Sequence, residues 1–155
     1  MDAIPGIGRR SAEKIIAEIG VHMAQFQSAD HLCSWAGLVP GMNESAGKRK
    51  PSHLRKGNVF LKATLVECAV AALRNKESFL YGRYMKIAPR RGHKRAVVAL
   101  AHTMLVTIYY MLRDNAPFRD LGANFYMQKH ADVLKNRNIH ALEKLGFTVA
   151  LTPKV

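Results

Sequence analysis

The first helical pattern of the sequence reads Ile4-Pro5-Gly6-Ile7-Gly8-Arg9-Arg10 and continues as Ser11-Ala12-Glu13-Lys14-Ile15-Ile16-Ala17-Glu18-Ile19-Gly20. Apolar residues recur at helical spacing from Ala12 to Ile19, and Gly20 is a typical helix stop. The glycines before the helix permit positive φ and a close backbone approach, so several N–H groups can converge on one phosphate. The segment therefore predicts a glycine turn followed by a helix.

This turn has the form of the hairpin in a helix-hairpin-helix motif. It predicts contacts to a phosphate backbone that ignore base identity, because they come from backbone N–H groups, a helix N-terminus and two arginines. The residues expected to make them are Gly6, Ile7, Gly8, Arg9 and Arg10. The alternative is a structural turn that only packs two helices. The motif is partial, since the helix expected before the hairpin is missing, which indicates a fragment or a remodelled hairpin.

The rest of the sequence predicts a mainly α fold. Residues 38–57 contain several prolines and glycines and predict a loop, and loops of this length in compact domains are usually functional or mobile. The remaining segments predict helices at 28–37 with Ser28 as N-cap, at 59–74 with Asn58 as N-cap, at 77–88 ended by Pro89-Arg90-Arg91-Gly92, at 93–114 and at 129–146, then a short strand or extended tail at 147–151. We expect a domain at 1–128 and a basic helical tail at 129–155.

Composition indicates a globular protein with a polyanionic partner. The 155 residues include 24 Lys and Arg against 11 Asp and Glu, which gives a formal net charge of +13. Such a field attracts phosphate backbones whatever the fold, without distinguishing DNA from RNA. Cys33 and Cys68 stand in apolar helical patterns, so we expect two buried thiols and a reducing compartment. No Cys/His spacing predicts a metal site in this chain.

A membrane location is the weaker of two interpretations of one apolar segment. Residues 96–112 are mostly apolar but short for a membrane span, and they include His102, Thr103 and Thr107. We therefore expect a core helix. Residues 1–20 have no secretory pattern, and we expect a cytoplasmic bacterial protein that associates with the nucleoid and not with membranes.

Ser45 is the candidate catalytic residue. It stands in the polar segment Asn43-Glu44-Ser45-Ala46-Gly47, which leads directly into a run of positive charge. A small hydroxyl beside cations suits a nucleophile that attacks a phosphodiester, because the cations stabilise charge on the phosphoryl oxygens. From the residues alone, a serine that merely caps or turns the loop stays an alternative. The cations expected to contact phosphate here are Lys48, Arg49, Lys50, Arg55 and Lys56, and His53 is either a proton carrier or simply solvated.

A second basic cluster lies at the expected start of the helix at 93–114. Its members are Arg90, Arg91, His93, Lys94 and Arg95, and Arg90, Arg91, Lys94 and Arg95 are the residues expected to bind nucleic acid. Cations at a helix N-terminus oppose the helix dipole, and this small cost favours a role in nucleic-acid binding. Tyr81 and Tyr84 are the tyrosine pair most suited to contact nucleic acid, although packing is the commoner role.

Together these segments resemble the carboxy-terminal domain of insertion-sequence 110-type (110/116/902) transposases, relatives of the Piv DNA invertases. The resemblance covers roughly residues 3–115, and residues 142–149 more loosely. It rests on Pro5-Gly6-Ile7-Gly8, Ser28-Ala29-Asp30-His31-Leu32-Cys33-Ser34-Trp35-Ala36-Gly37-Leu38-Val39-Pro40, Asn43-Glu44-Ser45-Ala46-Gly47-Lys48, Lys56-Gly57-Asn58 and Gly92-His93-Lys94-Arg95-Ala96.

The resemblance implies a DNA recombinase with a divided active site. Such proteins carry an amino-terminal RuvC-like domain whose acidic residues bind Mg²⁺, and their carboxy-terminal domain supplies a serine nucleophile, at the position of Ser45 here. The family is also described as guided by a structured RNA, and strand exchange implies a homo-oligomer of the full-length protein. This chain lacks the acidic domain, so we expect it to be inactive alone. The alternative is a non-catalytic nucleic-acid-binding or oligomerisation module from a truncated transposase.

Overall fold

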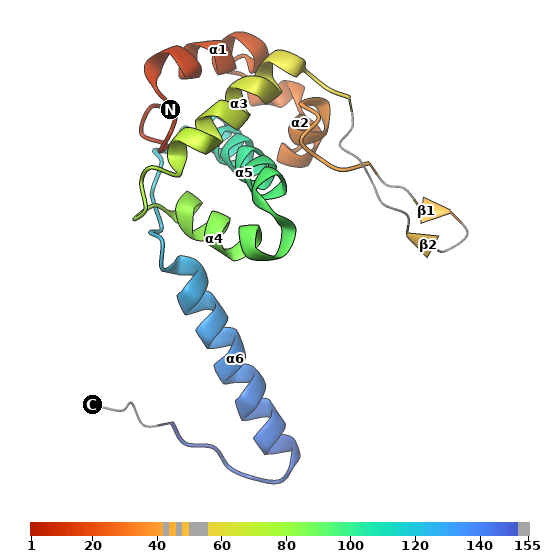
Figure 1. Cartoon of the computed structure of the whole chain (residues 1–155), viewed down its shortest axis with the longest axis vertical. Helices are drawn as coiled ribbons and strands as arrows, with labels where there is room; N and C mark the ends of the chain where they lie inside the picture. The colour runs from red at the N-terminus through yellow and green to blue at the C-terminus, as the bar shows by residue number, and fades with distance from the viewer. Residues whose placement is uncertain (42–43, 46–47, 50–55, 152–155) are drawn as a thin grey trace.

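The computed structural model describes residues 1–41, 44–45, 48–49 and 56–151, and it confirms a mainly α fold. The body of the molecule is helical, and a small hairpin and a long helix extend from it in different directions (Figure 1). The elements in chain order are α1 (Arg9–Ile19), the 3₁₀ turn η1 (Met23–Gln25), α2 (Ala29–Trp35), β1 (Glu44–Ser45), β2 (Lys48–Arg49), α3 (Val59–Ala72), α4 (Phe79–Arg91), α5 (His93–Arg113) and α6 (Phe125–Lys144).

Helix α5 is the centre of the core, and α2, α3 and α4 pack around it. Its side chains Leu100, Met104, Leu105 and Ile108 are fully buried. Within the described residues, α5 is also the one helix long and apolar enough to cross a membrane by length and composition. Its central place in the core accounts for that apolar composition, because a helix covered on most sides is apolar on most sides.

The helix N-caps follow from side-chain chemistry. The Ser28 hydroxyl accepts a hydrogen bond from the His31 N–H at 3.1 Å, and the Asn58 carboxamide oxygen accepts one from the Leu61 N–H at 2.9 Å. Both caps were expected, since a short polar side chain satisfies one of the free N–H groups of the first turn. The cap of α4 is Ser78, so this helix begins two residues after the expected start at residue 77.

Two further helix boundaries differ from the prediction. Helix α4 does not end at residue 88 but continues through Pro89 to Arg91, and Gly92 ends it with a φ of 79°. A proline this close to a C-terminus removes one hydrogen bond of the last turns, and a glycine with positive φ provides the stop. The tail helix begins at Phe125 and not at residue 129, because it starts by packing on α4. The division into domains at 128 and 129 stays a prediction.

We had expected residues 38–57 to form a loop throughout, but part of this segment forms a β-hairpin. Strands β1 and β2 pair antiparallel, with Glu44 opposite Arg49 and Ser45 opposite Lys48. In the sequence two residues separate the strands, and the second is Gly47, a spacing that favours a hairpin. At the other end of the chain, residues 147–151 form neither helix nor strand.

Candidate nucleic-acid interface

The segment that carries Ser45, residues 38–58, is hydrogen-bonded at both of its ends to the last residues of α2. Where it leaves the body, the Leu38 N–H donates to the Cys33 carbonyl at 3.0 Å, and where it returns, the Asn58 N–H donates to the Trp35 carbonyl at 3.2 Å. In the sequence, the hairpin of β1 and β2 lies between these two hydrogen bonds, and Figure 1 shows it at the side of the helical body. Both bonds hold the base of this segment against one short helix.

Gly57 allows the return of the segment. A Cβ at this position would lie 2.3 Å from the Gly37 nitrogen and 2.6 Å from the Ala36 carbonyl carbon, distances that real Cβ atoms essentially never show. The two backbones are therefore in contact where any side chain would separate them. Asn58, the next residue, also donates from its carboxamide to Glu18 of α1 at 2.6 Å. This hydrogen bond joins residues 40 positions apart, and no local sequence pattern predicts it.

The hairpin register places the Ser45 backbone directly opposite that of Lys48. The candidate nucleophile and one of its candidate cations are thus cross-strand neighbours, and Arg49 follows in the same strand. Lys56 is exposed beside Gly57 at the base of the segment. Lys50, Arg55 and His53 lie outside the described residues, so their expected roles stay predictions.

In the glycine turn before α1, Gly6 and Ile7 pack against the body, whereas the residues that follow are exposed. Gly6 has a φ of 84°, and a Cβ there would lie 2.2 Å from the Cys68 carbonyl oxygen of α3. Ile7 is buried, and its N–H donates to the Ile4 carbonyl at 3.0 Å, so this N–H is not available to a phosphate. Gly8, Arg9 and Arg10 are exposed. The predicted phosphate contacts of Gly6, Gly8, Arg9 and Arg10 stay predictions, whereas the Ile7 N–H is already engaged within the turn.

The second basic cluster spans two helix ends instead of one. Arg90 and Arg91 lie in the last turn of α4 and not at the start of α5, where we had expected them, because α4 continues through the proline. Lys94 and Arg95 lie in the first turn of α5, and all four side chains are exposed. The two arginines interact favourably with the negative C-terminal end of the α4 dipole, whereas Lys94 and Arg95 lie unfavourably at the positive N-terminal end of the α5 dipole. The structure thus concentrates four cations around Gly92.

A tyrosine joins the two helices beside this cluster. The Tyr84 hydroxyl and the His93 Nδ1 are 2.9 Å apart. Tyr84 therefore has a packing role, and its ring meets the imidazole edge to face. In Figure 1 the hairpin and the turn between α4 and α5 lie on the right-hand side of the body, whereas the chain start lies on the left.

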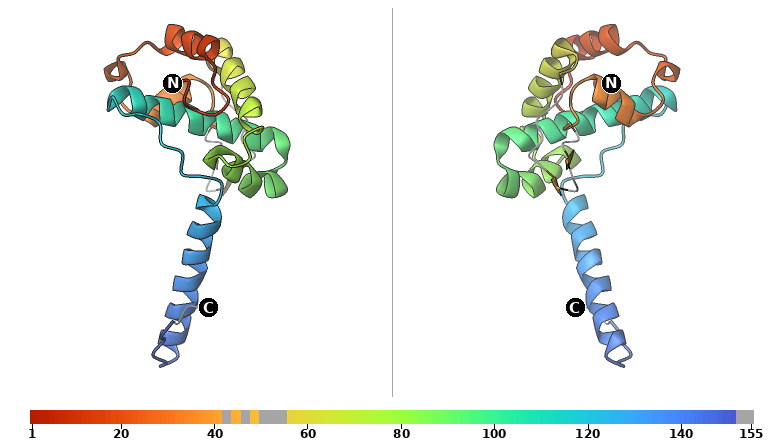
Figure 2. Two further views of the ribbon diagram at one scale, coloured as in Figure 1. Left: turned by 90° about the vertical axis from the view of Figure 1, so that its left-hand side faces the viewer. Right: turned by 90° about the vertical axis from the view of Figure 1, so that its right-hand side faces the viewer.

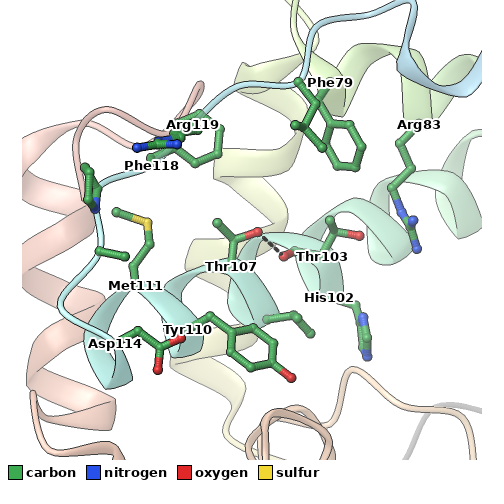
Figure 3. A pocket seen from close by; sticks show the side chains of 14 residues that line it. Phe79, Arg83, His102, Thr103, Thr107, Tyr110, Met111, Asp114, Phe118 and Arg119 are labelled. Carbon is green, nitrogen blue, oxygen red and sulfur yellow. Dashed lines mark hydrogen bonds between the residues drawn. The ribbon is translucent and has the colours of Figure 1, made fainter.

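A mostly apolar groove with a volume of about 470 Å³ lies along α5 (Figure 3). Its walls come from α4, from α5 and from the segment after α5, which is why no sequence pattern revealed it. Aromatic side chains line it, among them Phe79, Tyr110 and Phe118, and Arg83 stands at one end near His102. The Arg83 guanidinium donates to the Tyr126 hydroxyl at 2.7 Å, so this arginine links α4 to α6.

Burial changes the acidity of three side chains. It lowers the pKa of His102, and the nearby Arg83 charge lowers it further, so the imidazole is held neutral more firmly than usual. Burial raises the pKa of the Cys33 thiol to about 12 and also raises that of Cys68. Both thiols are buried, as expected, and stay protonated at neutral pH, so neither is a reactive nucleophile.

Within the described ranges, no group of three or more His, Cys, Asp or Glu side chains lies close enough together to hold a metal ion. The acidic side chains of α1, for example, are engaged singly: Glu13 pairs with Arg9 at 3.0 Å, and Glu18 accepts from Asn58.

Comparisons with known proteins agree with the resemblance in the sequence. A family model described as the Transposase IS116/IS110/IS902 family matches residues 1–84, more than half of the chain. The pilin gene-inverting protein of Moraxella bovis is 30% identical over 119 residues, which are 74% of this chain and 36% of that protein.

Proteins of two insertion elements match over the same extent. The IS900 42 kDa protein of Mycobacterium paratuberculosis is 32% identical over 119 residues, 75% of this chain and 29% of that protein. The IS110 43.6 kDa protein of Streptomyces coelicolor is 29% identical over 115 residues, 74% of this chain and 28% of that protein. The chain thus spans about a third of the length of these relatives. It belongs to the transposase IS116/IS110/IS902 family.

Proposed function

We propose that this chain is the DNA-binding and nucleophile-bearing part of a DNA transposase or recombinase, which cuts and rejoins DNA through Ser45 when it is joined to a Mg²⁺-binding RuvC-like domain. The observation that carries the proposal is the anchored hairpin, whose register sets Ser45 opposite Lys48. Family membership supports it, as does the name of the pilin gene-inverting relative, which describes inversion of a gene.

The chemistry is a phosphoryl transfer in two reversible steps. The Ser45 hydroxyl gives its proton to a base, its oxygen bonds to phosphorus, and the bond from phosphorus to the leaving deoxyribose oxygen breaks. The leaving oxygen takes up a proton and becomes a free hydroxyl. The phosphoserine link conserves the phosphoester, so attack by a second hydroxyl end rejoins DNA and releases the serine without ATP.

The cations of this chain have the role of holding phosphate. Lys48 and Arg49 are sequence neighbours of Ser45, and positive charge there would stabilise the charge that develops on the phosphoryl oxygens. The four cations around Gly92 would hold the backbone farther along the duplex. No step above is assigned to the metal. Mg²⁺ belongs to the RuvC-like domain in our proposal.

Three further properties belong to the full-length protein in this proposal. They are a structured guide RNA, assembly into a homo-oligomer, and a cytoplasmic location at the bacterial nucleoid. Each is carried over from the family or from the charge of the chain, and each is separable from the proposed role of Ser45.

A disulfide-capture experiment tests where the DNA phosphate lies. A Ser45→Cys variant is mixed with duplex DNA that carries a thiol tether on one phosphate, and the linked product is measured on a non-reducing gel. We expect at least tenfold more product than from the unmodified chain, because Cys33 and Cys68 are buried. Ser28→Cys is the matched control, since Ser28 is exposed but lies at the start of α2.

Two results would overturn the proposal. One is capture by Ser28→Cys that equals capture by Ser45→Cys, which would mean that DNA contacts the chain without preference. The other is no capture at position 45 while DNA still binds, which would place the phosphate elsewhere and leave a non-catalytic binding module.

A further inference from the structure

Among the residues that the structure describes, α6 contacts the body through its first turns. Phe125 and Tyr126 pack against Phe79 of α4, with ring centroids 5.4 and 5.1 Å from it. Beyond these residues the helix extends away from the body in all three views (Figures 1 and 2). Of the residues described in α6, none is buried. An isolated helix of this length is marginal in water, and helices in proteins are stabilised mainly by packing of an apolar face.

Such an apolar face is present along α6. Met127, Ala131, Asn138, Ala141 and Leu145, the residue that caps the C-terminal end of α6, are spaced by three, four or seven residues, so they fall on one line of the helix. All are exposed, and Met127 and Leu145 each have 73% of their surface in solvent. Leu142, also exposed, widens the same line. A single asparagine in a line of this kind fixes the register of a paired helix in coiled coils.

The apolar line begins in a groove between α4 and α6. This groove has a volume of about 590 Å³ and contains Met127 and Ala131 from the helix. Tyr81 and Met85 of α4 line its other side, and Met85 is half exposed. A second helix lying along α6 would therefore enter a preformed apolar groove at one end, in the way that amphipathic helices are recognised by other proteins.

The charges beside this surface are positive. Lys135 lies on one side of the apolar line, and Arg137 and Lys144 lie on the other. Lys76 and Lys86 line the groove. The acidic Glu143 lies on the opposite face of α6 and pairs with His140 at 3.1 Å. A second copy of α6 would bring further basic residues to this surface, whereas acidic residues would complement it.

We propose that α6 and the groove at its base form a docking surface for an acidic amphipathic helix of a partner protein. The partner helix has a line of leucine-type residues at heptad spacing and glutamate or aspartate on both sides of that line. At about 1.5 Å per residue, α6 offers a surface about 30 Å long, which matches a partner helix of about 20 residues.

A synthetic peptide of this chemistry tests the proposal. The probe is a fluorescein-labelled 28-residue peptide with leucine at heptad positions a and d and glutamate at e and g, which repels its own copies. Fluorescence anisotropy with the whole chain in 150 mM salt measures the affinity. Matched peptides are a scrambled sequence of the same composition and one with lysine at e and g. We expect the acidic heptad peptide to bind at least tenfold more tightly than either.

Variants of α6 locate the binding site. Leu145→Gln and Met127→Gln should each weaken peptide binding at least fivefold, because each removes an apolar side chain from the line. Val133→Gln is the matched control, since Val133 is an exposed apolar residue of α6 that lies off the line. It should leave the affinity within twofold. Circular dichroism confirms that each variant keeps its helix content.

Several outcomes would overturn the proposal. Equal binding of the scrambled peptide would reduce the effect to charge attraction. Equal weakening by Val133→Gln would exclude the apolar line as the site. Sedimentation as a dimer that Leu145→Gln dissociates would identify a second copy as the occupant. Binding to anionic phosphatidylglycerol vesicles or to DNA that is lost in Leu145→Gln would identify a membrane or nucleic acid instead.

Discussion

Replacing Gly57 with alanine tests whether the base of the Ser45 segment is as closely packed as the structure shows. The added Cβ would lie 2.3 Å from the Gly37 nitrogen, where ordinary contact begins at 3.4 Å. The two backbones must therefore separate by about 1 Å, since packed interiors leave no spare room at such a contact. That separation takes the hydrogen bond from the Asn58 N–H to the Trp35 carbonyl, now 3.2 Å, beyond bonding distance.

The expected loss of stability follows from these two effects. Overpacking of this kind costs about 1–3 kcal/mol, and the lost hydrogen bond about 0.5–1.5 kcal/mol. We expect Gly57→Ala to lower the free energy of unfolding by about 2–4 kcal/mol in urea titrations followed by circular dichroism. Gly8→Ala is the control, because nothing lies within 4 Å of a Cβ there, and we expect it to cost about 1 kcal/mol or less. A loss from Gly57→Ala no larger than the control would refute the anchored base.

Three further predictions concern a cap, a titration and the basic cluster. Ser78→Ala removes a buried hydroxyl that caps α4 and donates to the Asn75 carbonyl at 2.8 Å, so thermal unfolding should show a loss of about 1–2 kcal/mol. Because the pKa of His102 is lowered by folding, the contribution of the neutral imidazole to the free energy of unfolding is fully present above pH 6.5, the ordinary His pKa, and is lost as the pH falls toward the folded-state pKa. His102→Gln should therefore reduce the difference in free energy of unfolding between pH 7.5 and pH 5.5, measured by urea titration. Changing Arg90 and Arg91 together to glutamine should weaken DNA binding at least tenfold in a mobility-shift assay and change the melting temperature little, because both side chains are exposed.

The parts of the fold that were predictable are those set by local chemistry. Ser28 and Asn58 correctly predicted helix starts, and Gly20 correctly predicted a helix end, because each residue acts on the backbone within one turn. Pro89 misled the prediction because the rule that proline ends a helix is weakest in the last turn. The start of α6 was misplaced because Phe125 and Tyr126 join the helix through contacts with α4.

The candidate site was predictable only in its residue types. The charge run beside Ser45 is visible in the sequence, whereas the contact between Gly57 and Gly37 joins residues 20 positions apart and depends on the folded backbone. The arginines of the second cluster were identified, but their helix was not, since that depended on Pro89. The groove along α5 collects side chains from three segments, and such convergence has no local signal.

The most direct test of the central claim is the salt dependence of DNA binding by the whole chain. Fluorescence anisotropy on a labelled duplex from 50 to 300 mM salt gives the slope of log K against log salt, with Ser45→Ala measured in parallel. If about four to six cations of the hairpin and of the turn around Gly92 bind phosphates, the slope should lie between about −3.6 and −5.4 for both proteins. A slope shallower than −1, or no binding at 50 mM salt, would contradict the account of this chain as a phosphate-binding part of a transposase.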